Sequence, residues 1–331
     1  MRRDAFLAVL FLCPLFAGSA AAQSNIQIAQ CNGSEPDLVI RGCTGVITSK
    51  QASAQSISLA LSNRGVAFEK KGQNDRAMAD MQEAIKRDPK NPHAWVNRGN
   101  LYLAQGEFDR ALSDYNHAVA AHPNNAYTFG HRADAYLIHG DPQRAISDYD
   151  QAIKLDPKNP TFLARRGEAY RVEGNDDLAM QDFNRAIALN AKSAAAYVDR
   201  GLVYANRSDY DHAIADFNSA IEIDPDSAAS YVGRGNAYTR KGDYEHAIAD
   251  FDQAAKLNPE FPELFANRGL AYAKAGQYAR AIADFDNALS RNPKDALSSY
   301  NRAIAERSME HETGVVADKA HARGPDVDTG K

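Results

Sequence analysis

The sequence lacks the features that mark most nucleic-acid-binding and metal-binding proteins. Acidic residues outnumber basic residues by 43 to 38 and the formal net charge is -5, so no excess of Lys and Arg is available to neutralise phosphates. Only three cysteines occur, and no further ligands lie beside them at the spacing of a zinc site. We therefore expect no nucleic acid as a partner and no metal ion or other cofactor.

Catalytic motifs are also absent. The chain contains no G-x-x-x-x-G-K-[ST] phosphate loop, no H-E-x-x-H zinc motif and no G-x-S-x-G nucleophile motif. The histidines do not cluster, and His212 and His246 occupy the same surface position in two successive repeats rather than form a pair of catalytic bases. The sequence therefore predicts a protein that is not an enzyme.

Only one long apolar run occurs, and it lies at the amino terminus. It extends from Ala5 to Phe16, which is short of the roughly 20 residues that span a bilayer. Two arginines precede it, and small residues follow it up to Ala22 in the A-x-A arrangement of a cleavage site. Residues 1–22 are therefore predicted to be a signal peptide that is removed before Gln23. The mature protein is expected to be exported, either periplasmic or secreted, with no integral membrane segment.

The dominant feature of the sequence is a repeat with a period of 34 residues. An arginine recurs at this spacing, followed each time by glycine or alanine, at Arg64, Arg98, Arg132, Arg166, Arg200, Arg234, Arg268 and Arg302. A second pattern in the same phase places alanine, then a large residue four positions later, then alanine again, as in Ala111, Tyr115 and Ala118. A fixed period of this length indicates a stack of identical supersecondary units.

These columns resemble the tetratricopeptide repeat, whose signature is W-x2-L-G-x2-Y, then A-x3-F, then P. The residues that match the signature within one unit are Trp95, Gly99, Tyr102, Ala111, Tyr115 and Pro123. Arginine stands where the family usually has leucine. The resemblance implies an all-α fold, an α-α superhelix of seven 34-residue helix-turn-helix units followed by a C-terminal capping helix.

The domain boundaries are predicted from this period. Residues 23–57 form an N-terminal cap with a degenerate half-repeat, residues 58–310 the repeat array, and residues 311–331 a disordered tail. The units and the capping helix are expected at 58–91, 92–125, 126–159, 160–193, 194–227, 228–261, 262–295 and 296–310. Most units close with a proline, and Ala191 takes its place in one of them, where we expect a looser junction.

Two cysteines remain after cleavage of the signal peptide. Cys31 and Cys43 form an even pair in an oxidising compartment, which favours a disulfide; the alternative is two free thiols in a small cap. Residues 37–47 copy the spacing of a second repeat helix, but the connection to the next unit is four residues longer than a true repeat allows. A disulfide would attach the irregular lead-in to this half-repeat.

Aspartate also recurs every 34 residues, each time sixteen residues after one of these arginines. An Arg and an Asp could pair within one unit or between neighbouring units, and the last arginine, Arg302, has no such aspartate of its own. This mildly favours Asp284 reaching forward to Arg302. The principal interpretation is a ladder of partly buried ion pairs that fixes helix register, and the alternative is a stripe of ligand-binding arginines.

The resemblance assigns ligand binding to a concave groove lined by the first helix of each unit. The residues expected to be exposed there are His93, Asn97, Asn100, Tyr127, His131, Asp134, Arg165, Glu168, Asp199 and Asn236. They form a mixed hydrogen-bonding surface that suits an extended peptide or a polar polymer, although each could also be ordinary solvated surface. The leading hypothesis is a non-catalytic envelope adaptor that binds other proteins or peptides. The alternatives are a carrier of glycans or small polar ligands, and a structural solenoid that self-associates.

Overall fold

The computed structural model describes the backbone of residues 25–261 and 263–322. These residues form α-helices and contain no strand, which confirms the all-α prediction. They divide into two compact units, one ending at Leu189 and the other beginning at Asn190. The division lies beside Ala191, where the closing proline is missing. Each unit is described by itself below, and the predicted signal peptide lies outside the described residues.

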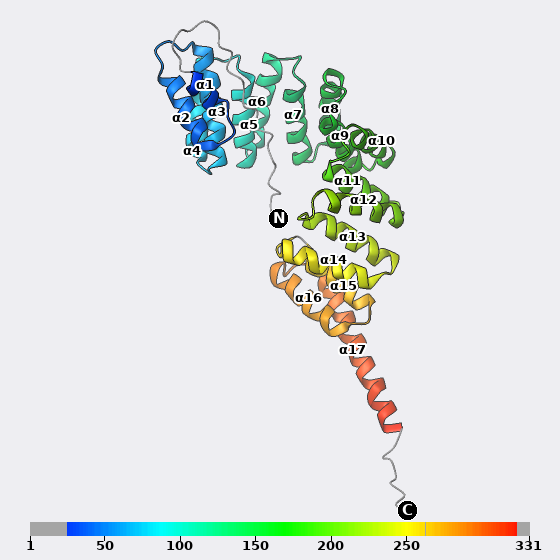
Figure 1. Cartoon of the computed structure of the whole chain (residues 1–331). Coiled ribbons are helices and arrows are strands. Elements are labelled where there is room, and N and C mark those ends of the chain that lie inside the picture. Colours follow the sequence, from blue (N-terminus) through cyan, green and yellow to red (C-terminus); the bar gives the residue numbers. More distant parts are fainter. Residues whose placement is uncertain (1–24, 262, 323–331) are drawn as a thin grey trace, which may run out of the picture. The chain divides into compact units, whose positions relative to one another are not determined.

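The described residues of the first unit form ten helices joined by short turns (Figure 1). Successive helices pack against each other as antiparallel pairs, and each pair packs on the next. The helices are α1 (Asn25–Cys31), α2 (Pro36–Thr48), α3 (Ala54–Lys70), α4 (Asn74–Arg87), α5 (Pro92–Ala104), α6 (Phe108–Ala121), α7 (Ala126–His139), α8 (Pro142–Leu155), α9 (Pro160–Glu173) and α10 (Asp176–Leu189).

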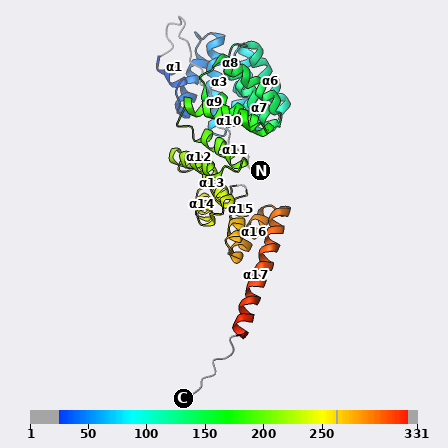
Figure 2. The same ribbon diagram turned by 90° about the vertical axis from the view of Figure 1, so that its right-hand side faces the viewer.

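The second unit repeats the same arrangement and ends in a longer helix, which is prominent in Figure 2. Its helices are α11 (Ala194–Asn206), α12 (Tyr210–Ile223), α13 (Ala228–Lys241), α14 (Tyr244–Leu257), α15 (Leu264–Lys274), α16 (Tyr278–Arg291) and α17 (Ala296–Ala322). The capping helix predicted to end at residue 310 therefore continues to Ala322. Residues 311–322 are helical in the structure, where the sequence predicted a disordered tail, and residues 323–331 lie outside the described residues.

The helix boundaries follow from a repeated turn. Gly140 ends α7 with φ 84°, in the left-handed conformation that glycine adopts without a steric penalty. Asp141 then accepts a hydrogen bond from the backbone N–H of Arg144 at 3.1 Å and caps α8, whose first residue is Pro142. Asp209 and Asp243 cap their helices in the same way, as predicted from the sequence.

The core of each repeat is a large side chain enclosed by small ones. Tyr115 is fully buried and packs across α5, where a Cβ atom built on Gly99 would lie 2.8 Å from the ring. Because such a contact is far below van der Waals distance, this position must be glycine or must force the ring to move. The close approach of the two helices that the glycine column predicts is therefore present.

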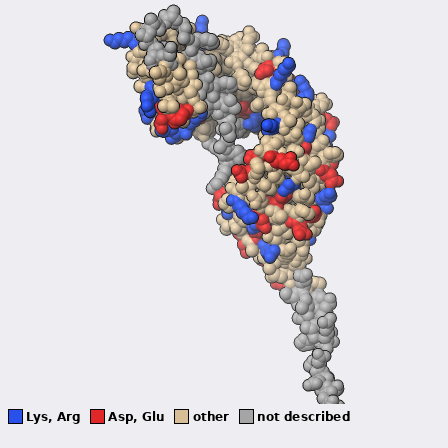
Figure 3. Space-filling model, in the orientation of Figure 1, with Lys and Arg blue, Asp and Glu red and all other residues tan. Residues whose placement is uncertain are grey.

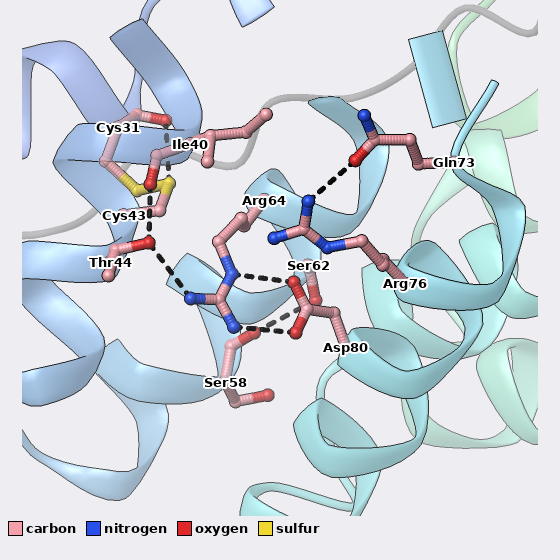
Figure 4. A network of polar contacts seen from close by, with 10 residues as sticks. All are labelled: Cys31, Ile40, Cys43, Thr44, Ser58, Ser62, Arg64, Gln73, Arg76 and Asp80. Atoms are coloured by element: carbon pink, nitrogen blue, oxygen red, sulfur yellow. Dashed lines mark hydrogen bonds and ion pairs between the residues drawn. A yellow bond between two sulfur atoms is a disulfide. The ribbon is translucent and has the colours of Figure 1, made fainter. Parts of the chain in front are cut away.

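A disulfide holds the amino-terminal cap together and a hydrogen bond attaches it to the array, both visible in Figure 4. A disulfide joins Cys31 of α1 to Cys43 of α2, as predicted, with the two Cα atoms 4.5 Å apart. Thr44 Oγ1 accepts a hydrogen bond from Arg64 Nη1 at 3.0 Å. Thr44 precedes Arg64 by 20 residues where later units use 16, which matches the longer connection expected from the sequence.

Candidate functional site

The arginine column forms the predicted ladder of ion pairs. In the third repeat, Arg132 Nε and Nη2 both donate to the carboxylate of Asp148 at 2.7 Å, and the side chains are only 19% and 8% exposed. The same pairing within one unit recurs in Arg64–Asp80, Arg98–Asp114, Arg166–Asp182, Arg200–Asp216, Arg234–Asp250 and Arg268–Asp284. The expectation that Asp284 reaches forward to Arg302 is therefore wrong. Arg302 instead binds Asp286 at 2.6 Å.

Most of these arginines also bind the segment before their own unit. Arg132 Nη1 donates to Asn116 of α6 at 2.8 Å, and Arg166 Nη1 donates to Asp150 of α8 at 2.6 Å. The guanidinium of Arg132 in addition lies over the ring of Phe129. One side chain thus joins three helices, and these contacts occupy most of its N–H donors. The arrangement supports a structural ladder rather than a ligand-binding stripe.

The first helices of the repeats lie along a common face. In the unit of residues 25–189, α3 contacts α5, α5 contacts α7, and α7 contacts α9, whereas among the described residues the second helices do not contact one another. Helices that touch on one side and diverge on the other make the touching side concave. The inner face of this unit is therefore formed by α3, α5, α7 and α9, as the family resemblance implies.

The structure places the predicted groove residues on first helices of the repeats but leaves most of them half-buried. Only Tyr127 and Asn236 are exposed; Asn97 is fully buried and the other seven are half-buried. The prediction of exposure is therefore wrong for eight of the ten residues. Eight of them belong to the first unit, whereas Asp199 and Asn236 lie on α11 and α13 of the second.

Four of these residues are brought together in a pocket between α5 and α7. His93 and Asn97 line it from α5, and Tyr127 and His131 line it from α7. Sequence reasoning missed the remaining lining residues, Pro92, Val96, Asn125 and Thr128. Asn97 is 2% exposed, and its Nδ2 atom has no hydrogen-bond partner among the described residues. The pocket is therefore lined by a residue whose buried donor is left unsatisfied.

A polar network continues along the inner face from this pocket. The hydroxyl of Tyr115 donates to Asn100 Oδ1 at 2.7 Å, and the hydroxyl of Tyr149 donates to Asp134 Oδ1 at 2.5 Å. Arg165 lies 3.9 Å from the Asp134 carboxylate. The sequence signal for this network is that only these two repeats have tyrosine in the buried aromatic column, where later repeats have phenylalanine.

Burial shifts the pKa values of Asp134 and His131, both on this face, in opposite directions. It raises the pKa of Asp134 from 3.8 to about 6, and the nearby Arg165 offsets only part of this effect. Burial likewise lowers the pKa of His131 from 6.5 to about 4. Both residues are therefore expected to resist charging within the groove.

These two shifts predict opposite pH dependences of stability. The carboxyl group of Asp134 binds its proton more tightly in the folded protein than in the unfolded chain. Its contribution to the stability of the folded state is therefore full below about pH 3.8 and is lost as the pH rises to about 6. The contribution of His131 is full above about pH 6.5 and is lost as the pH falls to about 4. In the native protein the two dependences largely cancel.

Single substitutions should reveal each dependence separately. From pH 6.5 to 4, Asp134→Asn should lose stability relative to the native protein, and His131→Asn should gain it, each by about 1–3 kcal/mol. Urea unfolding at several pH values would measure both changes, and referring each variant to the native protein removes the contribution of unaltered groups. Parallel pH profiles for all three proteins would contradict the assignment.

The described residues define an α-solenoid of stacked helix pairs with a polar inner face, and comparison with known proteins agrees. Models of the tetratricopeptide repeat match residues 62–126, 132–194, 194–227 and 262–295, and a TPR repeat model matches residues 235–276. Together these matches cover most of the array. The chain belongs to the tetratricopeptide repeat family, a class of interaction scaffold that is typically non-catalytic. No curated protein matches the sequence significantly.

Solved structures support the same fold. A tetratricopeptide repeat protein from Parabacteroides merdae is 25% identical, with 75% of this chain and 98% of that one covered and a TM-score of 0.60. The APC/C hetero-tetramer Cut9-Hcn1 matches at 20% identity, 82% and 53% coverage and a TM-score of 0.68. Yeast Tom70 matches at 16% identity, 94% and 70% coverage and a TM-score of 0.57. The last two show the fold alone.

The described residues contain neither a membrane-spanning helix nor a cluster of metal ligands. Among the helices of the described residues, none is long and apolar enough to cross a membrane. Within the same part of the chain, no three His, Cys, Asp or Glu side chains are arranged so that they could hold a metal ion. Acidic and basic side chains are interspersed on the surface seen in Figure 3.

Proposed function

We propose that the protein is a non-catalytic adaptor of the cell envelope that binds extended segments of other proteins on the inner face of α3, α5, α7 and α9. The observation that carries this proposal is the pocket between α5 and α7, which is lined by Asn97, Tyr127 and His131. Membership of a repeat family whose members bind proteins supports a polypeptide as the ligand.

The location in the envelope is supported by the predicted signal peptide and the disulfide. A disulfide between Cys31 and Cys43 is typical of a protein that folds in an oxidising compartment. Mass spectrometry of the protein from an envelope fraction should find an amino terminus at Gln23. A protein that retains residues 1–22 and is recovered with the cytosol would contradict this part of the proposal.

Site-specific photo-crosslinking tests which face binds. A photoreactive amino acid at Tyr127, which is 40% exposed on α7, should capture partner proteins from an envelope extract. Leu155 at the end of α8 is 39% exposed and provides a matched control outside the inner face. Crosslinks from position 127 but not 155 are expected. Equal crosslinking from both positions, or none from either, would contradict binding on the inner face.

A further inference from the structure

The last helix, α17, leaves an apolar face uncovered. Leu297 is 67% exposed, Tyr300 65% and Ile304 43%, and Ala296 and Ala303 are exposed beside them. Their spacing places all five residues on one side of the helix. Single exposed apolar side chains are ordinary, but a contiguous group of them marks a surface that binds another protein surface. We call these five residues the α17 face.

An earlier repeat covers the corresponding face with its own second helix. In α13 the residues that correspond to Ala296, Tyr300 and Ala303 are all buried, namely Ala228, Val232 and Gly235. The first two belong to one apolar cluster with Phe251 of α14, and a Cβ atom on the third would lie 3.0 Å from that ring. The last repeat lacks such a cover among the described residues, because α17 continues as one helix to Ala322. The α17 face is therefore a helix-packing surface without its usual partner.

The end of the array is made polar on another side of α17. Every earlier repeat has phenylalanine or tyrosine at the position of Glu306, whose carboxylate is 3.6 Å from Arg302. A terminal repeat is expected to carry polar side chains on its outer surface. Glu306 meets this expectation, whereas Leu297, Tyr300 and Ile304 do not. The α17 face thus keeps the apolar character of a covered surface.

The side-chain sizes on the α17 face match an antiparallel copy of the same face. When Tyr300 packs on Ala303 of the partner subunit, twofold symmetry also packs Ala303 on Tyr300 of the partner subunit. A large ring against a small residue is the packing that Phe251 and Gly235 make between two successive helices of this array. A second copy of the chain can therefore supply the antiparallel helix that the last repeat lacks.

The charges next to this face favour the antiparallel direction. With Tyr300 opposite Ala303, position 294 lies opposite position 309, so the exposed Lys294 comes beside Glu310 of the partner subunit. Symmetry forms the same pair a second time at the other end of the contact. A parallel arrangement would instead place Glu310 beside Glu310 of the partner subunit and align the two helix dipoles, and both effects are repulsive.

We infer that two copies of this chain form a dimer through the α17 face, with the two α17 helices antiparallel about a twofold axis. A surface that binds itself is used up on both copies, so the assembly closes as a dimer. Residues 323–331, which follow this helix, offer little to cover the face, because Val327 is their only large apolar side chain. The inference is independent of the proposed function, since α17 lies outside the inner face of α3, α5, α7 and α9.

Sedimentation velocity of the full mature chain at a series of concentrations tests the dimer. We expect a monomer–dimer equilibrium, and both Tyr300→Asp and Ile304→Asp should weaken it at least about tenfold, because each places a charge in an apolar contact. Ile26→Asp is the matched control, since Ile26 is 68% exposed but lies on α1. Its dimer should be unchanged. Circular dichroism should find the same helix content in all four proteins, because the substituted side chains are exposed.

Exchange of the two charges tests the direction of the helices. Lys294→Glu and Glu310→Lys should each weaken the dimer by about two- to fivefold, because each places like charges side by side. The double variant restores opposite charges and should recover the native affinity. A double variant that dimerises no better than the single variants would overturn the antiparallel arrangement.

Three outcomes of the sedimentation experiment would overturn the dimer. A native chain that stays monomeric up to about 0.1 mM would show that another protein, not a second copy, covers the α17 face. A dimer that both Tyr300→Asp and Ile304→Asp leave intact would place the contact elsewhere. Assemblies larger than a dimer, weakened by Ile26→Asp, would indicate a head-to-tail contact that involves the amino-terminal cap.

Discussion

Replacing Asp216 with alanine should lower the free energy of unfolding of the second unit by about 3–5 kcal/mol. Asp216 is buried and accepts two hydrogen bonds from Arg200, at 2.6 and 2.8 Å. The substitution leaves the Arg200 guanidinium, which is 19% exposed, without the carboxylate that compensates its charge. Urea unfolding followed by circular dichroism would measure the loss.

A double-mutant cycle identifies the partner. Arg200→Ala combined with Asp216→Ala should destabilise by less than the sum of the two single losses, with a coupling energy of about 1–3 kcal/mol. Arg234→Ala should show almost no coupling to Asp216, because Arg234 binds Asp250 at 2.7 Å. Coupling of Asp216 to Arg234 rather than to Arg200 would contradict the pairing within one unit.

An exposed ion pair in the same unit provides the control. Lys241 Nζ lies 2.5 Å from Asp211 Oδ1, but the two side chains are 49% and 77% exposed. Water screens such a pair, so Asp211→Ala should cost no more than about 1 kcal/mol. Equal losses in the free energy of unfolding from Asp211→Ala and Asp216→Ala would show that burial does not increase the contribution of the ion-pair ladder to stability.

The fold could be predicted because every repeat makes the same local contacts. Gly99 packs against Tyr115 only sixteen residues away, and the same pair recurs in most units, so a sequence period reports a packing period directly. The turns are equally local, since Gly140 and Asp141 end one helix and cap the next. The disulfide was predicted from the even pair of cysteines that follows the predicted signal peptide. Each of these features depends on a few neighbouring residues.

The partners of the arginines were harder to predict. One arginine can reach both the aspartate sixteen residues after it and the side chain sixteen residues before it in the sequence. Arg166 shows this by binding Asp182 and Asp150 together. Arg302, the last arginine, has no aspartate sixteen residues after it. This suggested that each aspartate of the column pairs with the arginine of the next unit. In the structure, a different column supplies that contact, with Asp286 at the final position.

The depth of the groove residues could not be predicted from the repeat. The position of a residue in a helix determines the direction in which its side chain points. The exposure of that side chain depends on the size of the side chains on the adjacent helices. Asn97 on α5 lines the pocket with Thr128 and His131 of α7 and is buried, whereas Asn267, at the same repeat position on α15, is half-buried. The unsatisfied donor of Asn97 is therefore a property of the folded array and not of its repeat.

The largest core effects are expected at Phe217, whose ring is enclosed by two glycines. A Cβ atom on Gly233 would lie 2.5 Å from the ring, and one on Gly201 would lie 3.2 Å from it. Phe217→Ala should cost about 3–5 kcal/mol, because the rigid surroundings leave a cavity. Gly233→Leu should cost about 1–3 kcal/mol by overpacking against the same ring.

The two changes should compensate when they are combined, because they act on the same volume from opposite sides. The leucine at position 233 can enter the space that the Phe217 ring leaves, so the double variant should recover about 1–3 kcal/mol relative to the sum of the single losses. Urea unfolding of the four proteins measures this coupling. Phe251→Ala combined with Gly233→Leu is the control, since the three atoms nearest to a Cβ on Gly233 all belong to the Phe217 ring. Additive losses for Phe217 and Gly233 would contradict the close packing of α12 against α13 and would remove the reason for glycine at this helical position.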